Sequence, residues 1–172
     1  DPNSKYAKYI NREETGVFNK RKILYGIDKA KKEISKKDKV LIMEGYMDVI
    51  ALSQNGLEGA VATLGTATTP LQVERIFQTS AEVVFCFDGD QAGRKAAWRA
   101  LESTLPHMRA GREANFLFLP EGEDPDTMIR AQGLQDFQTR MDQALPLSEF
   151  FFQRLSEGLR LDTIDGRAHL VD

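Results

Sequence analysis

The segment Val83-Val84-Phe85-Cys86-Phe87-Asp88-Gly89-Asp90 decides how this chain folds. Its five consecutive apolar residues are typical of a strand that is buried on both faces of a sheet, as the central strands of parallel sheets are. A turn follows directly, where Gly89 lets the backbone bend sharply enough for both aspartates to face one point. The segment therefore predicts a central strand with two carboxylates at its carboxyl end.

Other apolar runs predict further strands on either side of this segment. The strands are expected at residues 40–43, 60–62, 82–87 and 116–119, and helical spacing is found at 20–35, 47–54, 70–78 and 92–108. Thr69 and Pro70 are typical of an N-cap and a first helical residue. Near-continuous apolar strands that alternate with helices predict an α/β fold, in which helices cover both faces of a parallel sheet.

The same patterns divide the chain into three regions. Residues 1–38 are expected to form a basic arm and helix, residues 39–145 the α/β domain, and residues 146–172 the start of a small helical bundle. The last region carries an apolar stripe formed by Leu147, Phe150, Phe151, Leu155 and Leu159. Burial of each such side chain stabilises a fold by about 1.5–3 kcal/mol. We therefore expect this helix to pack against a neighbour, with Phe152 the most exposed of the three phenylalanines.

Charge is distributed unevenly along the chain, whose formal net charge is −3. Residues 1–39 carry a net charge of +6, whereas residues 40–172 carry −9. A basic arm joined to an acidic body can contact a polyanion at one end and hold metal ions at the other. The lysines between residues 29 and 39 are also explained as solvated residues of a helix, and that interpretation is favoured for this cluster.

Composition favours a cytoplasmic protein without a membrane span. The sequence contains no run of about eighteen apolar residues and no secretory signal pattern at its start. Its one cysteine, Cys86, lies in an apolar run and can form no internal disulfide. The histidines and the cysteine do not have the spacing of a zinc site.

Acidic residues follow two of the other predicted strands as well. Glu44 ends the first strand, and Asp48 lies one helical turn later on the same face. Asp124 and Asp126 follow the last strand. Because sites in open α/β sheets form at the carboxyl ends of the strands, we expect six carboxylates at one edge, where they repel one another unless cations neutralise them. Oxygen ligands suit Mg²⁺ or Mn²⁺, and a pair of such ions can clamp both oxygens of a phosphoryl transfer.

Each pair of carboxylates also has a purely structural explanation. Asp48 can favour a helix dipole from the first turn, and Asp124 can be an N-cap with Pro125 at the first helical position. For Asp124 and Asp126 taken singly, capping and metal binding are equally good interpretations. The aspartates beside Gly89 can form a plain turn, although their place after a buried strand favours metal binding. The coincidence of three pairs at strand ends is what supports a metal site.

These residues also carry a resemblance to a known family. Glu44-Gly45-Tyr46-Met47-Asp48 together with Asp88-Gly89-Asp90 resembles the Toprim signature of primases, topoisomerases and some nucleases. The longer strings EGYMDVIAL, ATLGTATT, FDGDQAGRKAAWRALE and FLPEGEDPDTMIR resemble bacterial DnaG-type primases, and the resemblance extends from about Lys8 to Gly166. It implies a Toprim-type sheet within a DNA-dependent RNA polymerase, which makes short RNA primers on single-stranded DNA by metal-dependent nucleotidyl transfer during replication.

The resemblance implies roles for individual residues. It assigns the binding of two or more Mg²⁺ or Mn²⁺ ions to Glu44, Asp88, Asp90, Asp124 and Asp126. It assigns the catalytic chemistry to Glu44, Asp48, Asp88 and Asp90, and it leaves open whether Glu44 is a metal ligand or a general base. Contacts to a nucleoside triphosphate are implied for Lys8, Asn11 and Lys20.

The resemblance also implies partners. These are a single-stranded DNA template, ribonucleoside triphosphates and a replicative helicase, the last bound through a domain outside this chain. Family members also bind zinc in an amino-terminal domain that this sequence lacks. We therefore expect a monomeric fragment of a longer enzyme, inactive or nearly so when isolated.

Two other classes of enzyme explain the sequence less well. A topoisomerase requires a catalytic tyrosine on a separate domain, a setting that none of the four tyrosines has. A phosphatase of the haloacid dehalogenase kind has its nucleophilic aspartate after an early strand, whereas here the pair comes late and Gln91-Ala92 follow it. A module that only binds a partner has no reason to gather six carboxylates at one edge.

Overall fold

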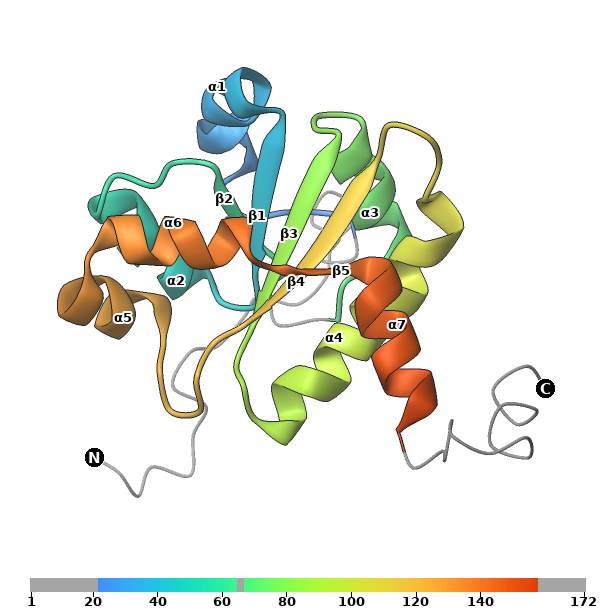
Figure 1. The fold of residues 1–172 in the computed structure, drawn as a ribbon. Coiled ribbons are helices and arrows are strands. Elements are labelled where there is room, and N and C mark those ends of the chain that lie inside the picture. Colours follow the sequence, from blue (N-terminus) through green and yellow to red (C-terminus); the bar gives the residue numbers. More distant parts are fainter. Residues whose placement is uncertain (1–21, 65–66, 158–172) are drawn as a thin grey trace, which may run out of the picture.

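A five-stranded sheet forms the centre of the computed structural model, which describes residues 22–64 and 67–157 (Figure 1). The strands lie in the order β2-β1-β3-β4-β5. Their bounds are Lys39–Met43 for β1, Ala60–Ala62 for β2, Glu82–Phe87 for β3, Glu113–Phe118 for β4 and Leu145–Pro146 for β5. The first four strands are parallel, and β5 pairs antiparallel to β4.

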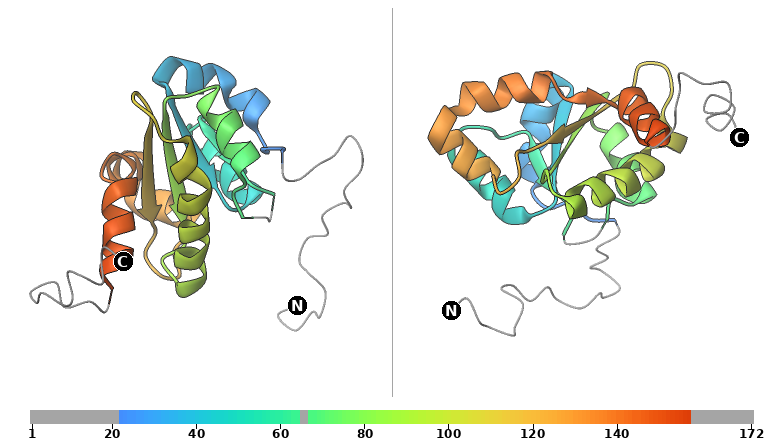
Figure 2. Two further views of the ribbon diagram at one scale, coloured as in Figure 1. Left: turned by 90° about the vertical axis from the view of Figure 1, so that its right-hand side faces the viewer. Right: turned by 60° about the horizontal axis from the view of Figure 1, so that its bottom comes forward.

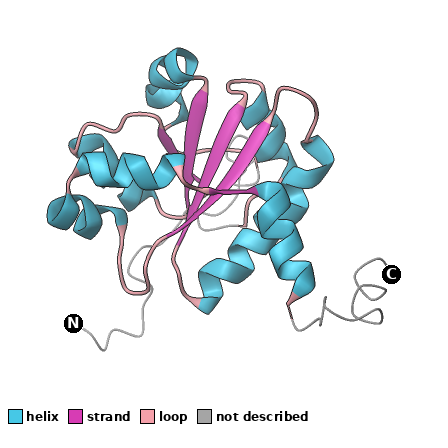
Figure 3. Ribbon diagram, in the orientation of Figure 1, coloured by secondary structure: helices cyan, strands magenta, loops and turns pink. Residues whose placement is uncertain are grey.

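Helices cover both faces of this sheet, as the sequence predicts (Figures 2 and 3). One face is covered by α1 (Ile27–Lys37), α3 (Pro70–Phe77), α4 (Gln91–Thr104) and α7 (Leu147–Ser156), and the other by α2 (Tyr46–Gln54), α5 (Pro125–Gln132) and α6 (Leu134–Asp142). A short 3₁₀ helix, η1 (Leu105–His107), follows α4. No helix in the described part of the chain has the length and apolar character needed to cross a bilayer.

The apolar run that predicts β3 contributes to two hydrophobic cores. Val83, Phe85 and Phe87 belong to the core under α1, α3, α4 and α7, whereas Val84 and Cys86 belong to the core under α2, α5 and α6. Successive side chains of a strand point to opposite faces, so a strand with helices on both sides must be apolar at every position. This explains why the run is continuous rather than alternating.

The strand order places a topological switch point between β1 and β3. From β1 the chain passes through α2 to β2 on one side, and from β3 it passes through α4 to β4 on the other side. Connections that leave adjacent parallel strands in opposite directions open a crevice outside their carboxyl ends, where ligands of such folds bind. The residues directly after Met43 and Phe87 therefore lie at the expected position for a site.

The first helix begins later than predicted. The apolar spacing indicated a helix over residues 20–35, but α1 starts at Ile27. Gly26 has a φ of 81°, a left-handed conformation that breaks a helix, and Tyr25 forms an isolated antiparallel bridge with Ala62. Ile23 and Leu24 thus precede the helix. The last predicted strand is also shifted, since β4 spans Glu113–Phe118, and neither α6 nor β5 was predicted.

Helix α7 finds its packing partner within the described chain. Leu147 and Phe150 are buried in the core beside β4, and the ring of Phe151 stacks on Trp98 of α4 with 6.1 Å between centroids. Phe152 is 58% exposed, which confirms that it is the most exposed of the three phenylalanines. Leu155 is also exposed, and Leu159 lies outside the described residues.

Close backbone contacts position the turn after β3. A Cβ atom on Gly89 would lie 2.1 Å from the carbonyl oxygen of Leu119, and one on Gly93 would lie 2.1 Å from that of Asp88. Both distances are far below van der Waals contact, so only glycine lets α4 start this close to the end of β3. The two glycines hold the segment of Asp88 against α4 and against the residues after β4.

We expect Gly93→Ala to destabilise the fold by about 1–3 kcal/mol or more, as overpacking of a dense interior does. The gain in helix propensity, about 1 kcal/mol, is too small to offset a clash with backbone. The matched control is Gly59→Ala, whose added Cβ would have no neighbour closer than 3.8 Å. Urea denaturation of both variants tests this, and equal stability of the two contradicts the packing described here.

Candidate metal centre

Two adjacent strands bring the principal acidic residues together. Glu44 follows β1 and Asp88 follows β3, and these strands pair in parallel with Ile42 opposite Phe85. Asp48 lies in the first turn of α2, and Asp90 is the N-cap of α4. The switch point of the sheet is therefore bordered by four carboxylates from two strand–helix connections.

Burial and mutual repulsion raise the pKa values of three of these carboxyl groups. For Glu44 the pKa is raised first by partial desolvation and then by the charges of Asp88, Asp90 and Asp48. The pKa of Asp88 is raised by desolvation and then by Asp90 and Asp124. As residues, Glu44 and Asp88 nevertheless remain accessible to solvent, so a ligand can reach them.

Asp48 belongs to the same electrostatic group. Desolvation, followed by the charges of Asp88 and Asp124, raises its pKa, and hydrogen bonds from the backbone amides of Gly45 and Asp48 offset part of that rise. Glu44, Asp48, Asp88, Asp90 and Asp124 therefore form one acidic cluster. Among the described residues, none of the ion pairs involves a carboxyl group of this cluster.

Two members of the acidic cluster also cap helices. A carboxylate oxygen of Asp90 accepts a hydrogen bond of 2.7 Å from the amide of Gly93 at the start of α4. Asp124 caps α5 through the amide of Thr127 at 2.8 Å, and the Thr127 hydroxyl in turn accepts from the amide of Asp124. A cap uses one carboxylate oxygen and leaves the other available, so capping and metal binding do not exclude each other.

Asp126 does not join the acidic cluster. Its carboxylate lies 2.9 Å from the guanidinium of Arg130, one turn along α5. Asp126 is also absent from the charges that raise the pKa values of Glu44, Asp48 and Asp88. Asp124 and Asp126 flank Pro125 and are equivalent candidates in the sequence, but in the structure only Asp124 belongs to the acidic cluster.

The arrangement fits a loosely held divalent cation. In the described part of the chain, no three carboxylate, histidine or cysteine side chains lie close enough to hold one ion between them, so Glu44, Asp88 and Asp90 do not form a ready three-ligand group. Mg²⁺ often needs only one or two carboxylates, because water and substrate phosphates complete its shell. The carboxylate oxygens of the acidic cluster are hard donors, and they repel one another because no described cation neutralises them. A divalent ion such as Mg²⁺ fits a set of donors of this kind.

The remaining predicted site residues, Lys8, Asn11 and Lys20, lie outside the described residues.

Sequence reasoning missed Arg99 of α4, which lines a cavity of about 250 Å³ together with Glu44. The sequence gives only a weak indication of this role. Ala96 lies three residues earlier on the same face of the helix, also lines the cavity, and is small enough to leave room beside Arg99.

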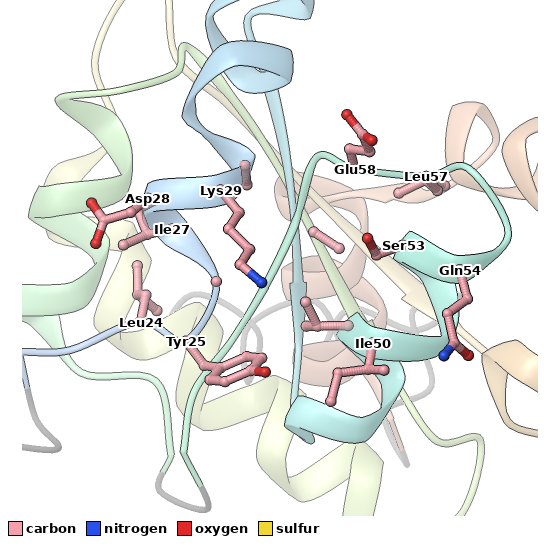
Figure 4. A pocket seen from close by; sticks show the side chains of 14 residues that line it. Leu24, Tyr25, Ile27, Asp28, Lys29, Ile50, Ser53, Gln54, Leu57 and Glu58 are labelled. Atoms are coloured by element: carbon pink, nitrogen blue, oxygen red, sulfur yellow. The ribbon is translucent and has the colours of Figure 1, made fainter.

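A larger cavity lies away from the acidic cluster. It measures about 480 Å³ and lies between α1 and α2, where Lys29, Ile50 and Ser53 face the same space (Figure 4). No residue of the acidic cluster lines it. The size of a cavity therefore does not locate the candidate metal centre in this molecule.

Comparison with known proteins agrees with this geometry. A family model for the Toprim domain matches residues 38–112, and a model for the DnaB-helicase binding domain of primase matches residues 148–172. The chain is 53% identical over 165 residues to a DNA primase of Pseudomonas aeruginosa, and 50% identical over 163 residues to that of Escherichia coli K12. Each alignment covers 95% of this chain but only 25% and 28% of the respective relative.

Solved structures resemble the chain equally well. A DNA primase domain from Pseudomonas aeruginosa superposes with a TM-score of 0.91 at 52% identity, over 96% of this chain and 52% of that one. A DnaG primase catalytic domain bound to single-stranded DNA has a TM-score of 0.91 at 48% identity, over 97% and 54% of the two chains.

A mainly parallel α/β sheet with acidic residues after β1 and β3, matched by the family model, defines a Toprim domain. The chain belongs to the bacterial DnaG-type primases and represents their Toprim-containing segment. It spans about a quarter of the length of the curated relatives it matches. The helicase-binding model matches residues 148–172, so the helicase-binding domain that was expected outside this chain begins within it, in residues assigned only to the start of a helical bundle.

We expect Asp88→Asn to leave the metal-free chain as stable as the wild type or more stable at pH 7, because it removes repulsion from the acidic cluster. The pKa of Asp88 is raised in the folded state, so the folded chain binds protons more readily than the unfolded chain. Wild-type stability should therefore rise as the pH falls from 7 towards about 4, the usual range of these carboxyl groups. The advantage of the variant should shrink over the same interval.

Asp126→Asn is the matched control, because it removes an exposed i,i+4 ion pair worth at most about 0.5 kcal/mol. Thermal unfolding in a chelator, at several pH values, measures both variants. A large loss of stability in Asp88→Asn at pH 7 would show that this carboxylate stabilises the fold instead of being held there at a cost.

Proposed function

We propose that this chain is the metal-binding part of a DNA-dependent RNA polymerase, a primase that makes short RNA primers on single-stranded DNA during replication. The observation that carries this proposal is the acidic cluster at the switch point, in which Glu44, Asp48 and Asp88 have raised pKa values and no cation partner among the described residues. Relatives named DNA primase and a similar catalytic domain bound to single-stranded DNA support the choice of reaction.

The reaction class we propose is metal-dependent nucleotidyl transfer. Two or more Mg²⁺ or Mn²⁺ ions would supply charge neutralisation for the triphosphate and Lewis-acid activation of the attacking hydroxyl. Asp88 would provide an exposed carboxylate at the end of β3, and Asp90 the oxygen that its cap leaves available. Asp48 and Asp124 would add negative charge, whereas Asp126 would contribute little because it pairs with Arg130.

Glu44 has two proposed roles. As a ligand it would hold an ion on the β1 side of the crevice. As a general base it would accept the proton of the attacking 3′-hydroxyl, and its raised pKa brings its basicity closer to that of a base working near neutral pH. Lys8, Asn11 and Lys20 are proposed to hold the incoming ribonucleoside triphosphate, and lysine suits this task as a point charge for phosphate.

We also propose binding partners, a further metal and a cellular location for the longer protein. Residues 148–172 match the helicase-binding model, so we propose that the longer protein contacts a replicative helicase through a region that begins here. A similar primase from Aquifex aeolicus combines zinc-binding and RNA polymerase domains, and we propose zinc for the longer form of this protein too. We propose that the reaction takes place in the bacterial cytoplasm and that the enzyme is a monomer. The isolated chain is proposed to prime weakly or not at all.

The test is Asp88→Asn in a protein of full family length that carries this sequence. Primer synthesis on single-stranded template with Mn²⁺ should fall at least about a hundredfold, since direct metal coordination contributes several kcal/mol of transition-state stabilisation. Asp126→Asn should stay within about threefold of the wild type. A normal priming rate for Asp88→Asn refutes the metal assignment, and rapid template-dependent synthesis by the isolated chain refutes the claim that other parts are needed.

A further inference from the structure

A second binding feature adjoins the acidic cluster. The cavity of about 250 Å³ beside Glu44 is lined by Thr63, Ala67, Thr68, Phe87, Ala96 and Arg99. It lies where β2 and β3 end and α4 begins its second turn, so it opens at the same edge of the sheet as the candidate metal centre. Its position alone makes it a place where part of a substrate can lie.

The polar groups of this cavity lack partners in the described structure. Thr63 and Thr68 are only 4% and 7% exposed, yet neither side-chain hydroxyl forms a hydrogen bond with a described residue. Arg99 likewise forms no ion pair or hydrogen bond with any of them. Buried hydroxyls are normally hydrogen-bonded, because an unsatisfied one costs about 1–3 kcal/mol. Two such hydroxyls beside a free guanidinium indicate a ligand that accepts hydrogen bonds.

The chemistry of the lining selects the ligand. A guanidinium and hydroxyl groups can all donate, and arginine suits bidentate contacts to planar or tetrahedral oxyanions. Glu44 on the same cavity would repel an anion unless a divalent cation lay between them. A phosphate group meets both conditions, because it accepts from arginine and hydroxyls and also binds Mg²⁺. The cavity is smaller than the roughly 300–1,000 Å³ of sites for whole ligands, so it suits one such group.

We propose that this cavity binds a phosphate group of the nucleotide or nucleic-acid substrate, held by Arg99, Thr63 and Thr68 opposite a cation at Glu44. The inference rests on the proposed function, since it takes the substrate class from it. It adds a phosphate position and three binding residues on the α4 side of the crevice. The phosphate belongs either to a free nucleoside triphosphate or to a nucleic-acid strand, and the two probes below separate these sources.

The experiment titrates the 172-residue chain with Mg²⁺·ATP and, separately, with a short oligodeoxythymidylate plus Mg²⁺, following amide NMR shifts. Arg99→Gln should weaken binding of one probe or both by about 10–100-fold, the usual effect of losing a hydrogen bond to a charged group. Thr63→Val should weaken it by about threefold to tenfold, as expected for a neutral hydrogen bond. Loss with ATP alone identifies a nucleotide phosphate, and loss with the oligonucleotide alone identifies a strand phosphate.

Stability gives an independent readout. Thr63→Val replaces an unsatisfied buried hydroxyl by a methyl group of similar shape, so its melting temperature should equal or exceed that of the wild type. The matched controls are Lys95→Gln, an exposed cation on α4, and Thr139→Val, an exposed threonine on α6. Both controls should bind the probes within about twofold of the wild type. Adenosine, which has no phosphate, should bind equally to wild type and Arg99→Gln.

Three results of these titrations would overturn the proposal. Unchanged affinity in both Arg99→Gln and Thr63→Val, an equal loss in Lys95→Gln, or no binding of either probe to the wild type overturns the proposal. Should Arg99→Gln fail to fold, Thr63→Val and Thr68→Val decide the matter in the same titrations. Asp88→Asn separates this proposal from the proposed function. If Asp88→Asn abolishes the Mg²⁺ dependence while Arg99→Gln changes nothing, the metal centre stands and the phosphate cavity fails; the reverse pattern refutes the metal centre alone.

Discussion

Repulsion between carboxylates at the ends of β1 and β3 is the constraint on which the rest of this structure depends. Desolvation and neighbouring negative charge raise the pKa values of Glu44, Asp48 and Asp88 together, so the folded chain holds these groups close at a cost. The cost is lowest when a cation enters the acidic cluster. Binding of a divalent ion therefore stabilises the folded state, which alone brings the carboxylates together.

The fold withstands this repulsion because the site is built on rigid parts. Phe85 of β3 is fully buried, and β3 has strands on both sides and helices on both faces. The turn that follows is fixed by the backbone contacts of Gly89 and Gly93, and the Asp90 cap ties it to α4. The backbone that carries Asp88 and Asp90 therefore cannot move without disturbing packed structure. The acidic cluster is thus preorganised by the core beneath it.

The sequence predicts the central strands well because their signal is local. An apolar run such as residues 83–87 has to be a doubly covered strand, and the carboxylates after it have to lie at the sheet edge. The predicted start of α1 was wrong because Ile23 and Leu24 fit a helical stripe as well as Ile27 does. Only the bridge between Tyr25 and Ala62, a contact between distant residues, shows that the helix begins later. β5, with two residues, is too short for any pattern.

The candidate site was predictable only in part, for a similar reason. Which carboxylates approach each other depends on tertiary contacts, so spacing could not show that Asp124 affects Asp48 and Asp88, whereas the i,i+4 pairing of Asp126 with Arg130 is local and was within reach of the sequence. Arg99 and Thr63 show the same effect, because the absence of a partner is a property of the folded neighbourhood. Spacing rules identify residues that share a helix face, but they do not reveal which polar group remains unsatisfied.

The central claim is that the acidic cluster binds divalent cations at the switch point. Crystals of the chain soaked in Mn²⁺ with a nucleotide, measured for anomalous scattering, test it most directly. The account predicts an anomalous peak bound by carboxylate oxygens of Glu44, Asp88 or Asp90, with water or phosphate completing its shell. An occupied Mn²⁺ site that appears only elsewhere, with none of these three residues as a ligand, would contradict it.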